Sequence, residues 1–121
     1  MTIEEQLANP MLTPAEIAAT RRLIGLSPEQ LAAIMNIGDR SVRRWETGAK
    51  IISDSAANAL LDLRQEHDED TKALATAEHI EIPAGTDLKP SSWWLAAAAR
   101  IIDRNPEATI NWHSDGTTRT H

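Results

Sequence analysis

Two helix starts and two helix stops fall within the 23 residues from Leu26 to Gly48. Ser27, Pro28 and then Gln30 form a pattern that begins a helix, because the serine and glutamine side chains can cap free backbone N–H groups. The pattern predicts a helix that reaches a turn at 36–38, followed by a second short helix that ends at Gly48. Two helices this short and this close in sequence must pack against each other.

The residue types in this segment suit a helix-turn-helix unit, whose second helix enters the major groove of DNA. Ala32 and Ala33 are small where the two helices cross, and Ile37 is an apolar plug in the turn. Val42 and Trp45 are three residues apart and are expected to anchor the second helix to the core. The outward side of that helix then carries Asp39, Arg40, Arg43, Arg44 and Thr47.

From about residue 12 to residue 64, the chain resembles the Xre/Cro/C1 family of helix-turn-helix regulators. The positions that match the family pattern are Ser27, Leu31, Ala32, Ile37, Ser41, Val42, Trp45, Glu46 and Gly48. Asn36 stands in place of the usual turn glycine, and Gly38 stands where a serine or threonine normally caps the second helix. Both departures are compatible with the fold, because asparagine accepts a left-handed conformation and glycine is only a slightly weaker cap.

The resemblance implies binding of double-stranded DNA and gives roles to seven residues. The residues expected to meet base edges are Asp39, Arg40 and Arg44, and arginine suits bidentate contact with guanine. The residues expected at the phosphate backbone, which position the protein without reading sequence, are Ser41, Arg43, Thr47 and Lys50. Asp39 has two alternatives, accepting from a cytosine amino group or orienting Arg43. A plain solvated helix face is the alternative for the three arginines.

The net charge of −6 is unevenly distributed along the chain. Residues 13–52 hold six bases against four acids, whereas residues 53–121 hold six bases against twelve acids. DNA attracts a local basic face, so the acidic average does not exclude DNA binding. An acidic remainder can lower non-specific binding. The asymmetry indicates two functional halves.

Outside the central segment, capping residues and periodicity predict three more helices and two short strands. The first expected helix is capped by Thr13 and stops at Gly25, and the second is capped by Ser53 and continues to about Glu78. The third runs from Trp93 to Arg104 and is capped by Ser91 or Ser92. The strands are expected at 79–82 and 108–113. The predicted fold is therefore mainly α, a lambda-repressor-like helix-turn-helix bundle with a C-terminal β-α-β dimerisation appendage.

The expected organisation is an N-terminal extension at 1–11, a DNA-binding domain at 12–65 and a dimerisation segment at 66–121. A sheet of only two strands is marginally stable in water, and in a monomer the apolar faces of both strands would be partly exposed to solvent. We therefore expect a second subunit to cover them. The residues assigned to dimerisation are Ile80, Ile82, Trp94, Ile110 and Trp112, with Trp112 packed on the helix at 93–102.

The whole chain also resembles the anti-CRISPR-associated autorepressors of phages and mobile elements, on the strand at 80–82, the helix ending at 102–106 and the strand at 109–113. This resemblance implies a dimeric autorepressor that binds an inverted repeat. Two half-sites roughly double the number of base pairs that the protein recognises. Alternatives are an antitoxin whose residues 66–121 neutralise a toxin, an interaction module that has lost DNA binding, and RNA binding by the same basic face.

Other classes of protein are disfavoured by the residues present. Without cysteine there is no disulfide, thiolate chemistry or zinc finger. No apolar run is long enough for a bilayer and no secretory segment begins the chain, so we expect a cytoplasmic protein without a membrane partner. Catalytic and cofactor motifs are missing, so neither an enzyme nor a cofactor is expected.

Two smaller features also have structural explanations. His67 lies near Glu66 and Asp70 at a loosely metal-like spacing, but a closed site needs more nitrogen or sulfur ligands than this region offers. We therefore expect no metal there. Trp93 and Trp94 are expected in the core rather than in a ligand cage.

Overall fold

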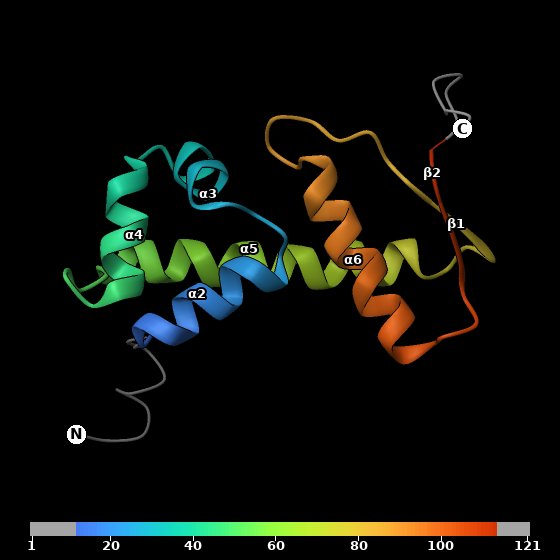
Figure 1. The fold of residues 1–121 in the computed structure, drawn as a ribbon, viewed down its shortest axis with the longest axis horizontal. Helices are drawn as coiled ribbons and strands as arrows, with labels where there is room; N and C mark the ends of the chain where they lie inside the picture. The colour runs from blue at the N-terminus through green and yellow to red at the C-terminus, as the bar shows by residue number, and fades with distance from the viewer. Residues whose placement is uncertain (1–11, 114–121) are drawn as a thin grey trace. The chain divides into compact units, whose positions relative to one another are not determined.

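The computed structural model describes residues 12–113, and in this range it has five helices and two strands (Figure 1). The chain divides into two compact units, one ending at Gln65 and the other beginning at Glu66. The first unit holds α2 (Pro14–Leu23), α3 (Pro28–Met35), α4 (Asp39–Thr47) and the first part of α5 (Asp54–Leu74). The second unit holds the rest of α5, β1 (His79–Ile82), α6 (Ser91–Arg104) and β2 (Thr109–Trp112). The predicted mainly α fold with a β-α-β appendage is confirmed.

The predicted extension at 1–11 and the last part of the predicted dimerisation segment, 114–121, lie outside the described residues. No helix within residues 12–113 is long and apolar enough to cross a membrane.

Two of the helix starts predicted for the first unit have the complete reciprocal cap. Thr13 Oγ1 accepts from the Glu16 N–H at 3.1 Å, and Glu16 Oε1 accepts from the Thr13 N–H at 2.9 Å. Ser27 and Gln30 make the same reciprocal pair at the start of α3, at 3.0 and 2.9 Å. Each pair satisfies two backbone donors that a helix start leaves free. These caps therefore fix where α2 and α3 begin.

The turn between α3 and α4 has the backbone that its residues predict. Asn36 is left-handed, with φ of 58°, and Gly38 occupies the N-cap of α4 in an extended conformation. Gly48, with φ of 85°, ends α4. Positive φ is easy for glycine and tolerable for asparagine, so the C-terminal ends of α3 and α4 are set locally.

The inner side of α4 packs into the core of the first unit. Val42 is fully buried and Trp45 is 5% exposed, while α2 and α3 both pack against α4. Burying a large apolar side chain contributes about 1.5–3 kcal/mol, so these two residues hold the helix firmly. The other large side chains of this unit that are at most 1% exposed among the described residues are Ile17, Ile24, Leu31 and Leu60.

The second unit is built on a parallel strand pair with α6 as the crossover. Ile80 pairs with Ile110, and Ile82 pairs with Trp112. Parallel strands need such a long crossover, because a hairpin turn cannot join them. Ile80 and Ile82 are only 2% and 3% exposed. The prediction that these two isoleucines are partly bare in a monomer is wrong, because α6 packs against β1.

Two predicted helix boundaries in this unit also differ from the structure. The helix α5 ends at Leu74 rather than near Glu78. After Ala75, the backbone N–H groups donate to the carbonyl three residues earlier instead of four, so the α-helical hydrogen-bond pattern stops. The helix α6 begins at Ser91, with Pro90 as its cap residue and without a side-chain cap. The antiparallel bridge between Gly85 and Pro90 brings the chain to this start, so no serine is needed there.

Candidate nucleic-acid interface

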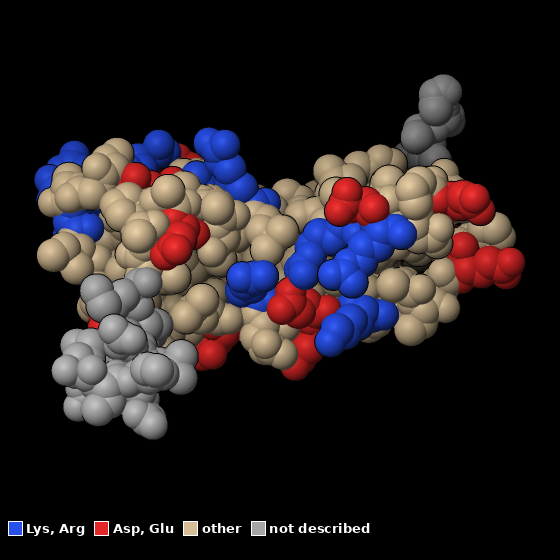
Figure 2. All heavy atoms as spheres, turned by 90° about the horizontal axis from the view of Figure 1, so that it is seen from below, with Lys and Arg blue, Asp and Glu red and all other residues tan. Residues whose placement is uncertain are grey.

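The outer side of α4 is a continuous polar surface. Val42 and Trp45 face the core, and the remaining predicted contact residues project the other way or lie beside the helix. The exposed ones are Asp39, Arg40, Arg43, Arg44, Thr47 and Lys50, and Ser41 is half-buried. Figure 2 shows basic side chains gathered over the end of the first unit that carries α4, with acidic groups between them. The structure therefore brings all seven predicted residues together.

The loop after α4 is tied back to the helix. The Lys50 N–H donates to the Arg44 carbonyl at 3.2 Å, and Thr47 Oγ1 donates to the same carbonyl at 3.2 Å. Both bonds use a carbonyl in the last turn of α4, where the helix leaves backbone acceptors free. They hold Lys50 close to the last turn of α4.

The arginines of α4 have different surroundings. Arg43 forms an ion pair with Glu29 of α3, and its Nε lies 3.7 Å from Asp39 Oδ2. In the part of the chain that the structure describes, neither Arg40 nor Arg44 has a carboxylate partner. The guanidinium groups of Arg40 and Arg44 are therefore free to bind an acceptor. The pair with Glu29 was not predicted from sequence, because the two residues lie 14 positions apart.

A buried ion pair fixes α4 against α2. Arg21 donates from Nε and Nη2 to the two carboxylate oxygens of Glu46, at 2.5 and 2.8 Å, and from Nη1 to the Leu26 carbonyl at 3.0 Å. The hydrogen bond with Glu46 raises the pKa of Arg21 above its ordinary value, although burial acts in the opposite direction. The guanidinium group of Arg21 is thus held charged. The pair was not predicted from sequence, because Arg21 and Glu46 lie 25 positions apart.

The residues assigned to dimerisation are distributed unevenly between the core and the surface. Ile80 and Ile82 are buried, Trp94 and Ile110 are half-buried, and Trp112 is 53% exposed. Nearly half of the Trp112 surface is covered, and its expected packing on α6 stays a prediction. Two large residues of α6 that were not among those assigned to dimerisation, Leu95 and Ile102, are exposed as well.

His67 is a structural residue of the second unit. It is fully buried, with Nε2 2.9 Å from the Trp93 carbonyl and Nδ1 2.9 Å from Arg100 Nη1. Because both ring nitrogens are engaged, neither is available to a metal. Glu66 and Asp70, the acids near it in sequence, both pair with Lys89.

Trp93 is a core residue, as predicted. It is fully buried, its indole Nε1 donates to Asp70 Oδ2 at 3.0 Å, and its ring meets the His67 ring edge-on at 4.7 Å.

A capped helix pair with an exposed, basic second helix defines the helix-turn-helix class of DNA-binding proteins. Residues 17–63, which run from α2 into α5, match the family model described as Helix-turn-helix. This segment is therefore similar to helix-turn-helix domains of the Xre/Cro/C1 type, and the match supports a role as a DNA-binding regulator. No curated protein matches the chain, so the whole-chain resemblance to anti-CRISPR-associated autorepressors stays a prediction.

Proposed function

We propose that the protein is a sequence-specific transcriptional repressor that binds an inverted-repeat DNA operator as a homodimer and represses its own gene. The observation that carries this proposal is the pair Arg40 and Arg44, exposed on α4 without carboxylate partners in the described residues. The clamp between Arg21 and Glu46 holds that helix in one orientation. A rigid helix with free guanidinium groups suits direct readout of bases in the major groove.

The proposed contacts follow the geometry of α4. Arg40 and Arg44 bind guanine edges through their planar forks, and Asp39, near the N-terminal end, meets a base or orients Arg43. The proposed phosphate contacts are Ser41, Arg43, Thr47 and Lys50. These groups set the register of the protein on the duplex and carry no sequence information themselves.

Dimerisation is supported by large apolar side chains that a single chain leaves exposed or half-buried on the second unit, here called its apolar surface: Leu95, Ile102, Ile110 and Trp112. In a parallel pair, partner residues lie on the same face of the sheet, so Ile110 and Trp112 share a face with buried Ile80 and Ile82. Leu95 and Ile102 are two turns apart on α6 and lie on one side of it. A second copy related by a two-fold axis would cover this surface.

The buried isoleucines of β1 then support this apolar surface from within rather than forming the contact. Trp94 is half-buried and lies one residue before Leu95. Aromatic residues often dominate the energetics of an interface, which makes Trp112 the main candidate for the centre of the contact.

The proposal is tested by selecting bound duplexes from a random pool with the full chain and footprinting the product. We expect two half-sites with inverted symmetry, their centres about 34 Å apart. Recovery of a single asymmetric half-site that one monomer saturates would contradict the dimer. Failure to retain any duplex, with RNA retained instead, would contradict DNA binding itself.

The apolar surface of the second unit is also compatible with a second candidate, an antitoxin that uses it to hold a different protein. Sedimentation of the chain purified from its native host separates the two. A dimer of this chain alone supports the repressor, whereas a stoichiometric complex with an unrelated small protein supports the antitoxin.

A further inference from the structure

His67 is fully buried in the second unit, where α5 meets α6. Its Nε2 lies 2.9 Å from the Trp93 carbonyl, and its Nδ1 lies 2.9 Å from Arg100 Nη1. A carbonyl can only accept a hydrogen bond, whereas a guanidinium can only donate one. The neutral ring with its hydrogen on Nε2 is therefore the one form that suits both neighbours. A hydrogen on Nδ1 would point at a donor.

Both neighbours of the His67 ring are held in place by further contacts. Arg100 Nη2 donates to Asp68 Oδ1 at 2.6 Å, which fixes the guanidinium beside the ring. The Trp93 indole meets the ring edge-on, with 4.7 Å between the ring centroids, and donates to Asp70 Oδ2 at 3.0 Å. A protonated His67 thus meets a fixed donor that is also a fixed positive charge.

The charged groups near the ring come from α5, from α6 and from the loop before α6; they are Glu66, Asp68 and Asp70, then Arg100, then Lys89. Burial lowers the pKa of His67 below its ordinary value, and Arg100 acts in the same direction. The Trp93 carbonyl and the carboxylates of Asp68 and Asp70 act against it. Each of these two carboxylates is already paired with a cation, Asp68 with Arg100 and Asp70 with Lys89. The neutral ring is therefore the form that this cluster favours.

The helix that contacts His67 also carries part of the apolar surface. Trp93 and Arg100 reach the ring from one side of α6, whereas Leu95 and Ile102 of the same helix are 47% and 44% exposed. Packed protein interiors are nearly incompressible and transmit strain. A displacement of α6 at the ring consequently moves the exposed residues as well.

We propose that His67 is an acid-sensitive switch for dimerisation: a proton bound at Nδ1 separates α6 from α5, disturbs the apolar surface and weakens operator binding. This rests on the proposed dimeric DNA binding and deepens it by naming a way to regulate it. The step adds one proton to each chain and replaces the hydrogen bond from Arg100 to Nδ1 with repulsion. No covalent bond changes. Histidine protonation acts on other protein interfaces in the same way.

The direction of the switch follows from where the proton binds first. A histidine that has left the cluster binds a proton near its ordinary pKa of about 6.5, whereas the enclosed ring resists it to lower pH. Dimerisation is therefore strongest above about pH 6.5 and weakens as the pH falls. All four histidines of the chain follow residue 65, so the first unit contains none. The contacts of one chain with one half-site should not share this pH dependence.

The test compares the full chain at pH 7.5 and pH 5.5. Sedimentation gives the dissociation constant of the dimer, and fluorescence anisotropy gives the affinity for the selected operator and for a single half-site. We expect the dissociation constant of the dimer to rise roughly tenfold or more at pH 5.5, because each separated chain binds one extra proton. Operator affinity should fall with it, and half-site affinity should stay the same.

Arg100→Gln isolates the proposed cause, because an amide oxygen can accept from a protonated Nδ1. In this variant His67 still titrates, but dimerisation should lose its pH dependence. Arg104→Gln is the matched control, since it removes the same charge from an exposed position of α6 and should keep the wild-type dependence. His113→Gln should keep it as well; this control covers the histidine that follows Trp112 and lies 3.2 Å from Glu81.

Nuclear magnetic resonance of ¹⁵N-labelled histidine in the wild-type protein keeps the test decisive if Arg100→Gln folds poorly. The Nδ1 resonance of His67 should report a neutral ring in the dimer and a protonated ring in the separated chain.

The contradicting outcomes are distinguishable. If wild-type protein is a monomer or binds no duplex at pH 7.5, the proposed function fails. If the dimer persists at pH 5.5, whether His67 has bound a proton or not, the switch is overturned. The switch is overturned as well if Arg100→Gln keeps the full pH dependence or if His113→Gln removes it.

Discussion

Arg43 and Arg44 are neighbours on α4, yet their charges are compensated differently. Arg43 is shared between Glu29 and Asp39, whereas Arg44 has no carboxylate partner within residues 12–113. Exposed ion pairs contribute only about 0–1 kcal/mol, so a DNA phosphate can compete with Glu29 for Arg43. At the scale of single residues, Arg44 is thus available to DNA without breaking an ion pair. Arg43 becomes available only when a DNA phosphate replaces Glu29 as its partner.

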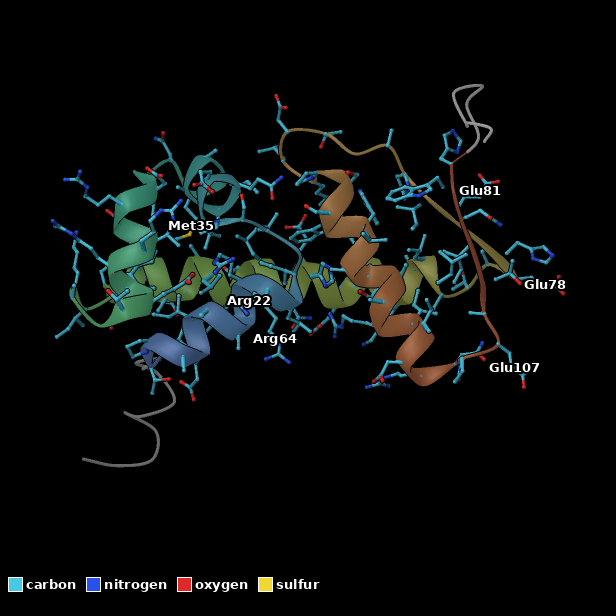
Figure 3. All side chains as sticks on the ribbon, in the orientation of Figure 1. Arg22, Met35, Arg64, Glu78, Glu81 and Glu107 are labelled. Carbon is cyan, nitrogen blue, oxygen red and sulfur yellow. The ribbon has the colours of Figure 1, made fainter. Side chains whose placement is uncertain are left out.

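Replacing Arg44 with alanine should cost roughly 1–3 kcal/mol of specific binding and relax discrimination at one base position. The physical reason is the loss of a bidentate contact to one guanine. Fluorescence anisotropy with the operator and its single-base variants measures both effects. Arg64→Ala is the control, because it removes the same charge from an exposed position on α5 of the same unit (Figure 3). Equal losses for both variants on all sequences would show that Arg44 does not read a base.

Replacing Glu29 with glutamine should strengthen binding to random-sequence DNA and steepen its salt dependence by about one unit of slope, because Arg43 is released to a phosphate. Arg43→Ala should do the opposite on all sequences alike. Salt titrations of both variants measure this. Asp62→Asn on α5 is the control, since it makes the same charge change at an exposed residue without an ion pair in the described chain. If Glu29→Gln and Asp62→Asn behave alike, the pair with Glu29 does not restrain Arg43.

At the scale of helices, α4 owes its orientation to both apolar and ionic contacts. Val42 and Trp45 hold its inner side, and Arg21 joins α2 to Glu46 near its end. A buried charge that loses its partner is strongly unfavourable. Both side chains of the pair are at least 86% buried, so solvent screens them only weakly.

Replacing Glu46 with glutamine should therefore lower the free energy of unfolding by about 3 kcal/mol or more, because the Arg21 charge stays buried without its partner. Urea denaturation followed by far-UV circular dichroism measures this. The double change Arg21→Met with Glu46→Leu should recover most of the loss, as apolar replacements of buried pairs often do. A single variant as stable as wild type would show that the pair does not hold α4.

The elements that sequence predicted best are those fixed by neighbouring residues. The caps at Thr13 and Ser27, the left-handed Asn36 and the stop at Gly48 each depend on contacts within three or four positions. The partners of the site residues could not be found in this way, because Glu29 and Arg43, like Arg21 and Glu46, meet only in the folded chain. The burial of Ile80 and Ile82 likewise depends on how α6 crosses β1, which periodicity does not determine.

His67 joins α5 to α6 in a neutral form. Burial lowers its pKa below the ordinary value, and the nearby Arg100 acts in the same direction, against the hydrogen bond with the Trp93 carbonyl and the charges of Asp68 and Asp70. In the neutral ring, Nε2–H donates to that carbonyl and Nδ1 accepts from Arg100. Protonation would turn Nδ1 into a donor facing another donor.

The free energy of unfolding should consequently be largest above about pH 6.5, the unfolded pKa, and fall as the pH drops toward the lower folded-state pKa. The sign follows because the unfolded chain binds the proton first. Urea denaturation at pH 5.5 and 7.5 measures it. His67→Gln should remove most of the dependence, and His79→Gln, at an exposed position in β1, should leave it intact. An unchanged dependence in His67→Gln would assign it to other groups.

At the scale of the whole molecule, the two units divide the charge between them. The seven predicted contact residues lie on the first unit, while the acidic excess follows residue 53. Clustered basic groups supply a local attraction to DNA, and the acidic remainder opposes binding elsewhere. A small module of this kind gains specificity by pairing, since each copy contributes one half-site.

Trp112 provides the test of that pairing. It is 53% exposed in a single chain, so its truncation removes few contacts inside the second unit. At the centre of an interface, in contrast, truncation of such an anchor costs about 2 kcal/mol or more. Trp112→Ala should therefore keep the helical circular dichroism of wild type, sediment as a monomer at concentrations where wild type is a dimer, and lose operator affinity.

The base contacts of such a monomer should be unchanged. On a single half-site, the monomer should therefore still discriminate between guanine and other bases. Leu88→Ala is the matched control, because Leu88 is a 67% exposed apolar residue in the loop between β1 and α6 rather than on either element. It should remain a dimer. A Trp112→Ala protein that is fully helical and still dimeric would move the contact away from β2, most simply to the outer side of α5.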